Sequence, residues 1–180
     1  MASSINASTS GAGGVITTAD NTGTLQLQSG GTTIATISST GLQQNVGAPA
    51  FSVTKSSGQS ITATTTTKVT FDTETFDTNN NFASSTFTPT VAGYYQLNVN
   101  LNFGTTGSGQ VNLFKNGSIF LNGTPATYNG SIGGIMPLSC MVYMNGSTDY
   151  IEVYTYTTAT VTINSGAQNT QFSGFLARSA

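Results

Sequence analysis

The chain of 180 residues contains no histidine, no tryptophan and only one cysteine. Without histidine it lacks the side chain that proteins use most often as a general base or as a metal ligand. A single cysteine, Cys140, excludes a disulfide within the chain. Cys140 lies in an apolar run without a basic neighbour that would make its thiol reactive, so we expect a small core residue there.

Charge is also scarce. Lys and Arg number four and Asp and Glu six, so that charged residues make up 6% of the chain, against about 25% in typical proteins. A net charge of −2 leaves little with which to hold phosphate groups, and we do not expect nucleic-acid binding. Because the acids are too few to favour a pair of catalytic carboxylates, we expect neither enzymatic activity nor a cofactor.

Long hydrophobic runs are missing as well. No stretch resembles a membrane span, and the opening residues, MASSINASTSGAGG, include no apolar segment long enough for a signal peptide. We therefore expect neither membrane insertion nor export by that route.

Four Asn-Gly pairs precede Ser or Thr, a pattern that fits glycosylation but that tight turns with positive φ also explain. These pairs are Asn116-Gly117, Asn122-Gly123, Asn129-Gly130 and Asn145-Gly146.

What the chain has in abundance is a period of two residues. In GYYQLNVNLNF, residues 93–103, apolar side chains from Tyr95 onward alternate with Gln and Asn. A strand sends alternate side chains to opposite faces, so one face lies in a core and the other is polar without being charged. No segment has helical periodicity, and many short strands with frequent turns indicate an all-β sandwich or jelly roll. The other predicted strands are 51–55, 68–71, 82–87, 110–115, 118–121, 138–144, 150–156, 160–164 and 171–177.

Composition divides the chain at about residue 50. Within residues 1–50, the stretch GTLQLQSGGTTIATIS predicts a hairpin that turns at Gly30-Gly31. A hairpin alone is marginally stable in water, so this one must pack on sister chains or on a larger partner. We predict an N-terminal docking and hairpin segment, 1–50, followed by a jelly-roll domain, 51–180.

Aromatic residues and glycines in the second region closely resemble the signature of the C1q/TNF-like jelly roll. FTPTVAGYYQ looks like the core of that signature, NLFKNGS like a family hairpin and QFSGFLA like the last strand. The spacing from Phe82 to Phe87 is two residues shorter than usual, and Leu97 replaces an aromatic. The residues that carry the resemblance are Phe71, Phe82, Phe87, Gly93, Tyr95, Phe172 and Phe175.

The resemblance covers residues 51–180 and implies an antiparallel jelly-roll sandwich. It also implies a homotrimer, because this family packs three jelly rolls about an axis through apolar surfaces. Phe172 and Phe175 lie three residues apart on one strand and therefore point to opposite faces. We expect one of them in the core and the other at an interface.

Residues 17–41 resemble the opening of fibre and appendage proteins of tailed bacteriophages, cyanophages in particular. This implies a structural protein of a virion assembled in the host cytoplasm, docked on other virion proteins through residues 1–50. The jelly-roll head would then contact a host surface glycan or protein. Two alternatives remain open, namely a capsid decoration or head-fibre protein without receptor binding, and a cellular C1q-like adhesin or lectin.

Tyrosines and two glycine-rich loops are the candidate binding features. Tyrosines suit recognition because an apolar ring carries a polar tip. The tyrosines of 150–156 share one strand face with Glu152, and a trimer interface or second core face is the favoured explanation of that face over ligand binding. The loops 103–110 and 122–134 could form a distal binding surface. The candidate surface residues are Tyr128, Tyr150, Tyr154 and Tyr156.

Half of the acids, Asp72, Glu74 and Asp77, fall within six residues. Carboxylates are the hard oxygen ligands that calcium prefers, and some C1q-like relatives bind calcium. No ligand loop of recognised spacing accompanies these acids. A charged strand edge that discourages pairing with other strands is the alternative, and we assign no metal ligand.

Overall fold

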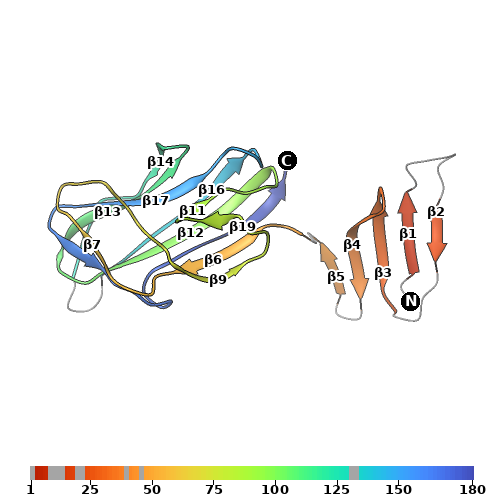
Figure 1. The fold of residues 1–180 in the computed structure, drawn as a ribbon, viewed down its shortest axis with the longest axis horizontal. Helices are drawn as coiled ribbons and strands as arrows, with labels where there is room; N and C mark the ends of the chain where they lie inside the picture. The colour runs from red at the N-terminus through yellow and green to blue at the C-terminus, as the bar shows by residue number, and fades with distance from the viewer. Residues whose placement is uncertain (1–2, 8–14, 19–22, 39–40, 45–46, 130–133) are drawn as a thin grey trace. The chain divides into compact units, whose positions relative to one another are not determined.

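The computed structural model describes residues 3–7, 15–18, 23–38, 41–44, 47–129 and 134–180, which form two compact units, Met1–Gly47 and Ala48–Ala180 (Figure 1). Over these described ranges the chain forms strands and turns and no helix. It follows that no described segment is a helix able to span a membrane. The predicted all-β class is confirmed.

The first unit is a five-stranded sheet with the order β2-β1-β3-β4-β5. The hairpin predicted from the sequence is confirmed, because β3 and β4 pair antiparallel and the turn between them has φ values of 57° at Gly30 and 80° at Gly31. β1 pairs with β3 in parallel. The strands are β1 (Ser3–Ala7), β2 (Val15–Thr18), β3 (Leu25–Ser29), β4 (Thr32–Ser38) and β5 (Gly41–Gln44).

The second unit is a jelly-roll sandwich of two antiparallel sheets. The β17 sheet has the order β10-β11-β17-β13-β14, with β8 beside β17 and β15 beside β13. Its strands are β8 (Thr67–Lys68), β10 (Phe82–Ala83), β11 (Thr86–Phe87), β13 (Gly107–Lys115), β14 (Ser118–Asn122), β15 (Ala126–Tyr128) and β17 (Ile151–Thr157).

The β12 sheet has the order β7-β18-β12-β19-β6-β9. In addition, β16 pairs with β12 along its whole length. Its first and last strands in the unit, β6 and β19, are direct neighbours. Its strands are β6 (Ala50–Thr54), β7 (Gln59–Ile61), β9 (Thr73–Asp77), β12 (Gly93–Phe103), β16 (Gly134–Met144), β18 (Val161–Ile163) and β19 (Gln171–Ser179).

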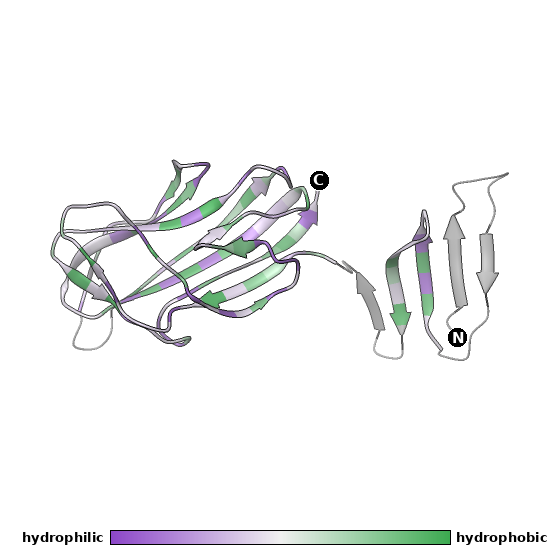
Figure 2. Cartoon of the chain, viewed as in Figure 1, coloured by the Kyte–Doolittle hydropathy of each residue, from purple (hydrophilic) through white to green (hydrophobic). Residues whose placement is uncertain are grey.

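The core lies between the two sheets and contains the apolar face predicted for β12. The side chains from Tyr95 to Phe103 on that face are all buried, and the strands of both sheets alternate in hydropathy along their length (Figure 2). Phe51 stacks on Phe87 with ring centroids 4.2 Å apart and meets the edge of Phe172 at 4.9 Å. Each such ring contributes about 1.5–3 kcal/mol through its removal from water.

Gly93 begins β12 where β19 comes very close. A Cβ at this position would lie 2.4 Å from the carbonyl oxygen of Arg178. This distance is too short for any residue with a side chain. The pairing of β12 with β19 shifts register just after this point, between Tyr94 and Tyr95. The signature glycine therefore allows two backbones to approach each other.

The Asn-Gly turns are only partly as predicted. Asn116 and Gly117 have φ values of 54° and 76° and join β13 to β14, as expected of a two-residue hairpin. Gly146 also has positive φ, 71°. At Asn122-Gly123 the prediction is wrong, because Gly123 has ordinary φ and its amide donates to the Val111 carbonyl, leaving no room for a Cβ. Gly130 lies outside the described residues.

Candidate binding surfaces

The tyrosine face of β17 exists, and its residues differ in what they contact. Ile151 and Val153 are buried on the opposite face, as predicted. The Tyr154 ring lies 4.1 Å from that of Phe114, and burial together with the nearby Glu152 charge raises the pKa of the Tyr154 hydroxyl. Glu152 is neutralised by Lys68 at 2.6 Å. The middle of this face is thus occupied by contacts within the chain.

Tyr128 is a core residue and not the surface residue that the sequence suggested. Its side chain is 4% exposed, and its ring stacks on Phe103 at 4.4 Å. Burial raises the pKa of its hydroxyl. The ring fits because Gly107 and Gly134 carry no side chain, and a Cβ at Gly134 would lie 2.4 Å from the Cβ of Tyr128. Part of the predicted loop 122–134, residues 130–133, is outside the described chain.

Tyr156 borders a pocket at the end of the β17 sheet. It lies directly opposite Gln110 of β13, and both side chains are half-buried. Pro125 lies on the other side of Gln110, because the next residue, Ala126, pairs with Gly109. The pocket thus joins the predicted loops 103–110 and 122–134 to the tyrosine face. Gln110 and Pro125 were not singled out from the sequence, although both fall within those loops.

The signature residues divide between core and surface. Phe71, Phe87, Tyr95 and Phe172 are buried, and Phe82 is half-buried against them. The Tyr95 hydroxyl donates to the Val91 carbonyl at 2.7 Å, and burial raises the pKa of Tyr95 to about 12. Phe175 is 48% exposed, whereas Phe172 is fully buried. The two residues therefore point to opposite faces, as predicted.

The solvent face of the β12 sheet carries an apolar patch around Phe175. Gln96 lies between Phe175 and Met141 in the register, and Tyr94 pairs with Tyr143, with ring centroids 5.5 Å apart. Met141 is 57% exposed. We call these residues the β12-sheet patch: Tyr94, Met141, Tyr143 and Phe175. The alternation GIMPLSCMVYM along β16 could have revealed Met141 and Tyr143 from the sequence.

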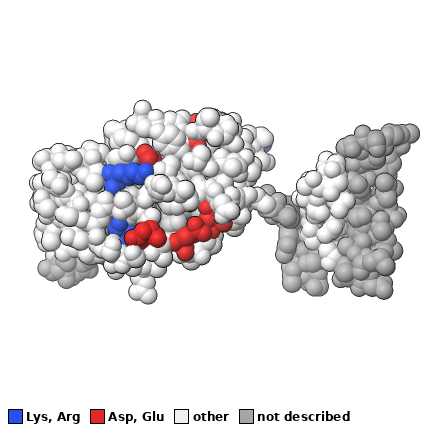
Figure 3. Space-filling model, viewed as in Figure 1, with Lys and Arg blue, Asp and Glu red and all other residues white. Residues whose placement is uncertain are grey.

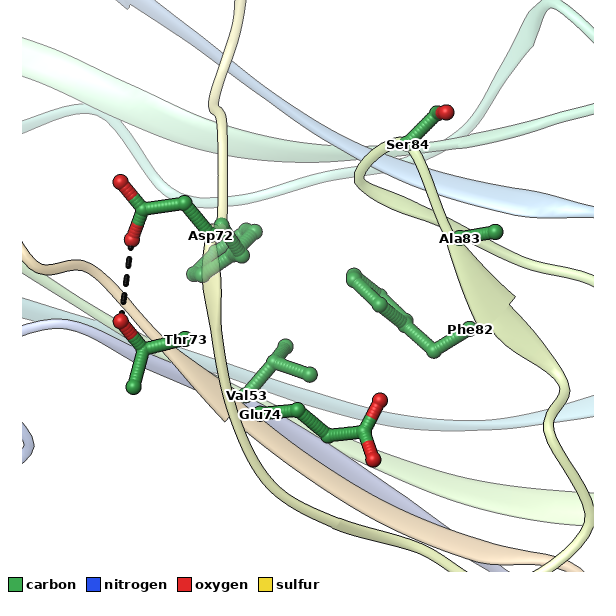
Figure 4. A pocket seen from close by; sticks show the side chains of 8 residues that line it. Val53, Asp72, Thr73, Glu74, Phe82, Ala83 and Ser84 are labelled. Atoms are coloured by element: carbon green, nitrogen blue, oxygen red, sulfur yellow. Dashed lines mark hydrogen bonds between the residues drawn. The ribbon is translucent and has the colours of Figure 1, made fainter.

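The three clustered acids do not converge. Asp72 accepts hydrogen bonds from the Ser56 amide at 2.7 Å and hydroxyl at 2.8 Å, which hold the pKa of its carboxyl below the usual value. Asp77 accepts from the Phe82 amide at 2.7 Å. In the small pocket that Phe82 lines, Asp72 and Glu74 direct their carboxylates to different sides (Figure 4). Among the described residues, no group of three or more His, Cys, Asp or Glu side chains could hold a metal ion.

Four of the remaining charges form two local ion pairs, Lys68–Glu152 and Lys115–Asp149, on a mostly uncharged surface (Figure 3). Lys115 contacts Asp149 at 2.8 Å, at the end of the β17 sheet where the two Asn-Gly turns meet. Asn116 and the Asn145 amide also donate to Asp149, at 2.8 and 3.0 Å. Within the described residues, charges this sparse form no broad field of one sign to attract a charged partner.

The geometry defines an all-β jelly-roll domain with an apolar patch on the solvent face of its β12 sheet. The chain belongs to the C1q domain family, whose pattern matches residues 50–177. No curated protein sequence matches the chain.

Solved structures agree with the fold. The globular domain of zebrafish complement 1qA protein superposes with a TM-score of 0.50 at 16% identity, covering 74% of this chain and 99% of that one. Murine APRIL gives 0.57 at 9% identity over 72% and 98% of the two chains. Eiger TNF from S. frugiperda gives 0.52 at 10% identity over 74% and 93%. At these identities the likeness concerns the fold alone.

Proposed function

We propose that the protein is a homotrimeric appendage protein of a tailed-phage virion. In this proposal the Ala48–Ala180 unit is a C1q-like head that contacts the host surface, and residues 1–50 dock on other virion proteins. The observation that carries the trimer is the uncovered β12-sheet patch on a domain whose own core is already complete. Exposed aromatic and Met side chains of this kind are typical of interface cores.

A trimer needs two different surfaces on each chain, because a threefold axis brings one patch of a protomer against another patch of its neighbour. The β12-sheet patch is one such surface. The edge strand β14 offers a second, since Ile119 and Phe120 are both exposed there. Two separate apolar surfaces on one domain are what a closed ring of three requires.

Sedimentation velocity of the full chain at micromolar concentration tests the trimer. We expect a trimer for the wild type and dissociation in Met141→Asp, because three charges would be buried at an apolar interface. Ala83→Asp places the same charge at an exposed position of β10 and should leave the trimer intact. A monomeric wild type, or a trimeric Met141→Asp variant, contradicts the proposal.

The likeness of residues 17–41 to phage fibre openings supports the virion assignment, as does a surface with few charges, which salt affects little. Antibodies raised against the chain should label purified phage particles at a fixed position. Labelling of the tail or its fibres supports host contact. Labelling of the shell alone would instead indicate a capsid decoration, and binding to cells without particles a cellular adhesin.

A further inference from the structure

The pocket beside Tyr156 has a volume of about 260 Å³, and its lining residues lie at the end of the sandwich where β13 begins and β17 ends. The strands β13 and β17 are labelled in Figure 1. The first strand of the unit, β6, begins near the start of β12 at Gly93, and the last strand, β19, ends there. The pocket lies at the opposite end of the sandwich. Its lining consists of Ser108, Gly109, Gln110, Pro125, Tyr156 and Thr158.

Three neighbouring chain segments build the pocket in one row. Gln110 of β13 lies in the middle, the Tyr156 ring on one side and the Pro125 ring on the other. Hydrogen bonds fix the rim, since the Thr158 amide and hydroxyl both donate to the Ser108 carbonyl, at 2.9 and 3.1 Å. The Ser108 and Thr127 hydroxyls also share a hydrogen bond of 3.2 Å. The two rings are therefore held apart by a rigid frame.

The polar groups at the centre of this frame are available to a ligand. Neither the Gln110 side-chain amide nor the Tyr156 hydroxyl bonds to any residue in the described part of the chain. The Thr155 hydroxyl donates to the backbone carbonyl of Gln110 and leaves the side chain available. A Gln amide both donates and accepts, as does a tyrosine hydroxyl. The pocket thus offers two apolar walls with adaptable hydrogen-bonding groups between them.

Charge selects the ligand class. None of the six lining residues is acidic or basic, and the two lysines of this sheet, Lys68 and Lys115, are paired with Glu152 and Asp149. A carboxylate or phosphate would enter this pocket without a counter-charge, which is unfavourable. A sugar ring without charge suits it, because its C–H face can lie on the two rings while its hydroxyls bond to the amide.

We propose that this pocket binds a neutral sugar ring of a surface polysaccharide. The inference rests on the proposed function in one respect, namely that three pockets of a trimer act together. A single shallow pocket of this kind binds weakly, with a dissociation constant on the order of millimolar. Linking three sites raises the overall affinity by about 10²–10⁴ without any new contact.

Saturation-transfer difference NMR on the full chain tests the pocket. The probes are the methyl glycosides of glucose, galactose and mannose, together with N-acetylglucosamine and the anionic N-acetylneuraminic acid. We expect saturable transfer from at least one neutral sugar and none from the anionic one. Tyr156→Ala should weaken binding about tenfold, whereas Tyr156→Phe, which keeps the ring, should weaken it only about threefold.

Gln110→Ala provides a second variant, expected to lose about fivefold, should Tyr156→Ala fail to fold by circular dichroism. Phe76→Ala truncates an exposed aromatic residue on the other sheet and is the matched control, without effect on binding. Absence of saturable transfer from every neutral sugar overturns the inference, as does binding only of the anionic sugar or of a protein. Equal binding by wild type, Tyr156→Ala and Gln110→Ala overturns it too.

Sedimentation of the same samples separates the two proposals. A trimer that binds no neutral sugar overturns the pocket assignment and leaves the proposed trimer standing. A monomer that binds sugar through Tyr156 supports the pocket assignment and overturns the trimer.

Discussion

Asp149 lies 2.8 Å from the ammonium group of Lys115 and joins two turns that are far apart in sequence. One turn follows Lys115 at Asn116, whose amide group donates to Asp149 at 2.8 Å, and the other begins at Asn145, whose backbone amide donates at 3.0 Å. Both groups are at least three-quarters buried, so the surrounding water screens this pair less than an ordinary surface pair.

Asp149→Asn removes the charge and keeps the size of the side chain. We expect a loss of about 1–3 kcal/mol in the free energy of unfolding at neutral pH, because hydrogen bonds to a charged group are lost. The Lys115 and Asn116 hydrogen bonds hold the pKa of the Asp149 carboxyl below its usual value. Its stabilisation is therefore complete above the unfolded-state pKa of about 3.9 and disappears as pH falls through the lower folded-state pKa.

Urea unfolding at fixed protein concentration between neutral pH and pH about 3 measures this effect. The wild type should lose more stability on acidification than Asp149→Asn. Glu74→Gln is the control, because the exposed Glu74 carboxylate makes no hydrogen bond within the described residues. Parallel acid profiles for wild type and Asp149→Asn would contradict the assignment.

Ionisation of the buried Tyr95 hydroxyl should limit the stability of the protein at alkaline pH. Burial raises the pKa of Tyr95 to about 12 in the folded protein, whereas the same hydroxyl ionises at pH about 10 in the unfolded chain. Stability from this residue is therefore complete below pH about 10 and is lost as pH rises toward 12. Tyr95→Phe should cost about 0.5–1.5 kcal/mol at neutral pH, through the bond to Val91, and should show a shallower alkaline loss.

Gly93→Ala tests the close approach of β19 to β12. We expect a loss of about 1–3 kcal/mol or more, because the added methyl group would overlap the Arg178 carbonyl and force the strands apart. Ser179→Ala, at the paired and exposed position on β19, should change stability little. Thermal melts at equal concentration measure both variants. An unchanged melting temperature in Gly93→Ala would show that the register shift at this point can absorb a side chain.

Cys140 should react slowly in the folded protein. It is half-buried on β16, and burial raises the pKa of its thiol, which lowers the fraction of reactive thiolate at neutral pH. A thiol-disulfide reagent followed by absorbance should modify the native chain at least about tenfold more slowly than the urea-unfolded chain. Equal rates in the two states would show that the Cys140 thiol is exposed to solvent in the folded protein.

The sequence predicts the core better than the surface, because burial leaves a periodic trace. Leu97, Val99 and Leu101 alternate with amides along β12, and their burial follows directly from that alternation. Strand β9 leaves no such trace. Its first four residues are exposed, and it forms only because its backbone pairs with that of β6, from Phe51 to Thr54.

Candidate sites depend on contacts between segments that are distant in sequence, which no local pattern encodes. Tyr128 lies in a glycine-rich loop and still turns inward, because residues 107 and 134 leave space for its ring. The pocket at Tyr156 needs Gln110 and Pro125, and the strand register that joins them emerges only from the paired sheet. That Phe172 and Phe175 point to opposite faces could be predicted without the strand register, because it follows from the alternation of side chains along a single strand.

The pairing of β6 with β19 has a practical consequence for engineering. Because the first and last strands of the jelly roll are neighbours, Ala50 opposite Phe175, the domain begins and ends at one pole. A fluorescent label fused after Ala180 would be attached far from the pocket beside Tyr156. The same proximity would allow the whole domain to be inserted into a surface loop of a host scaffold as a removable cassette.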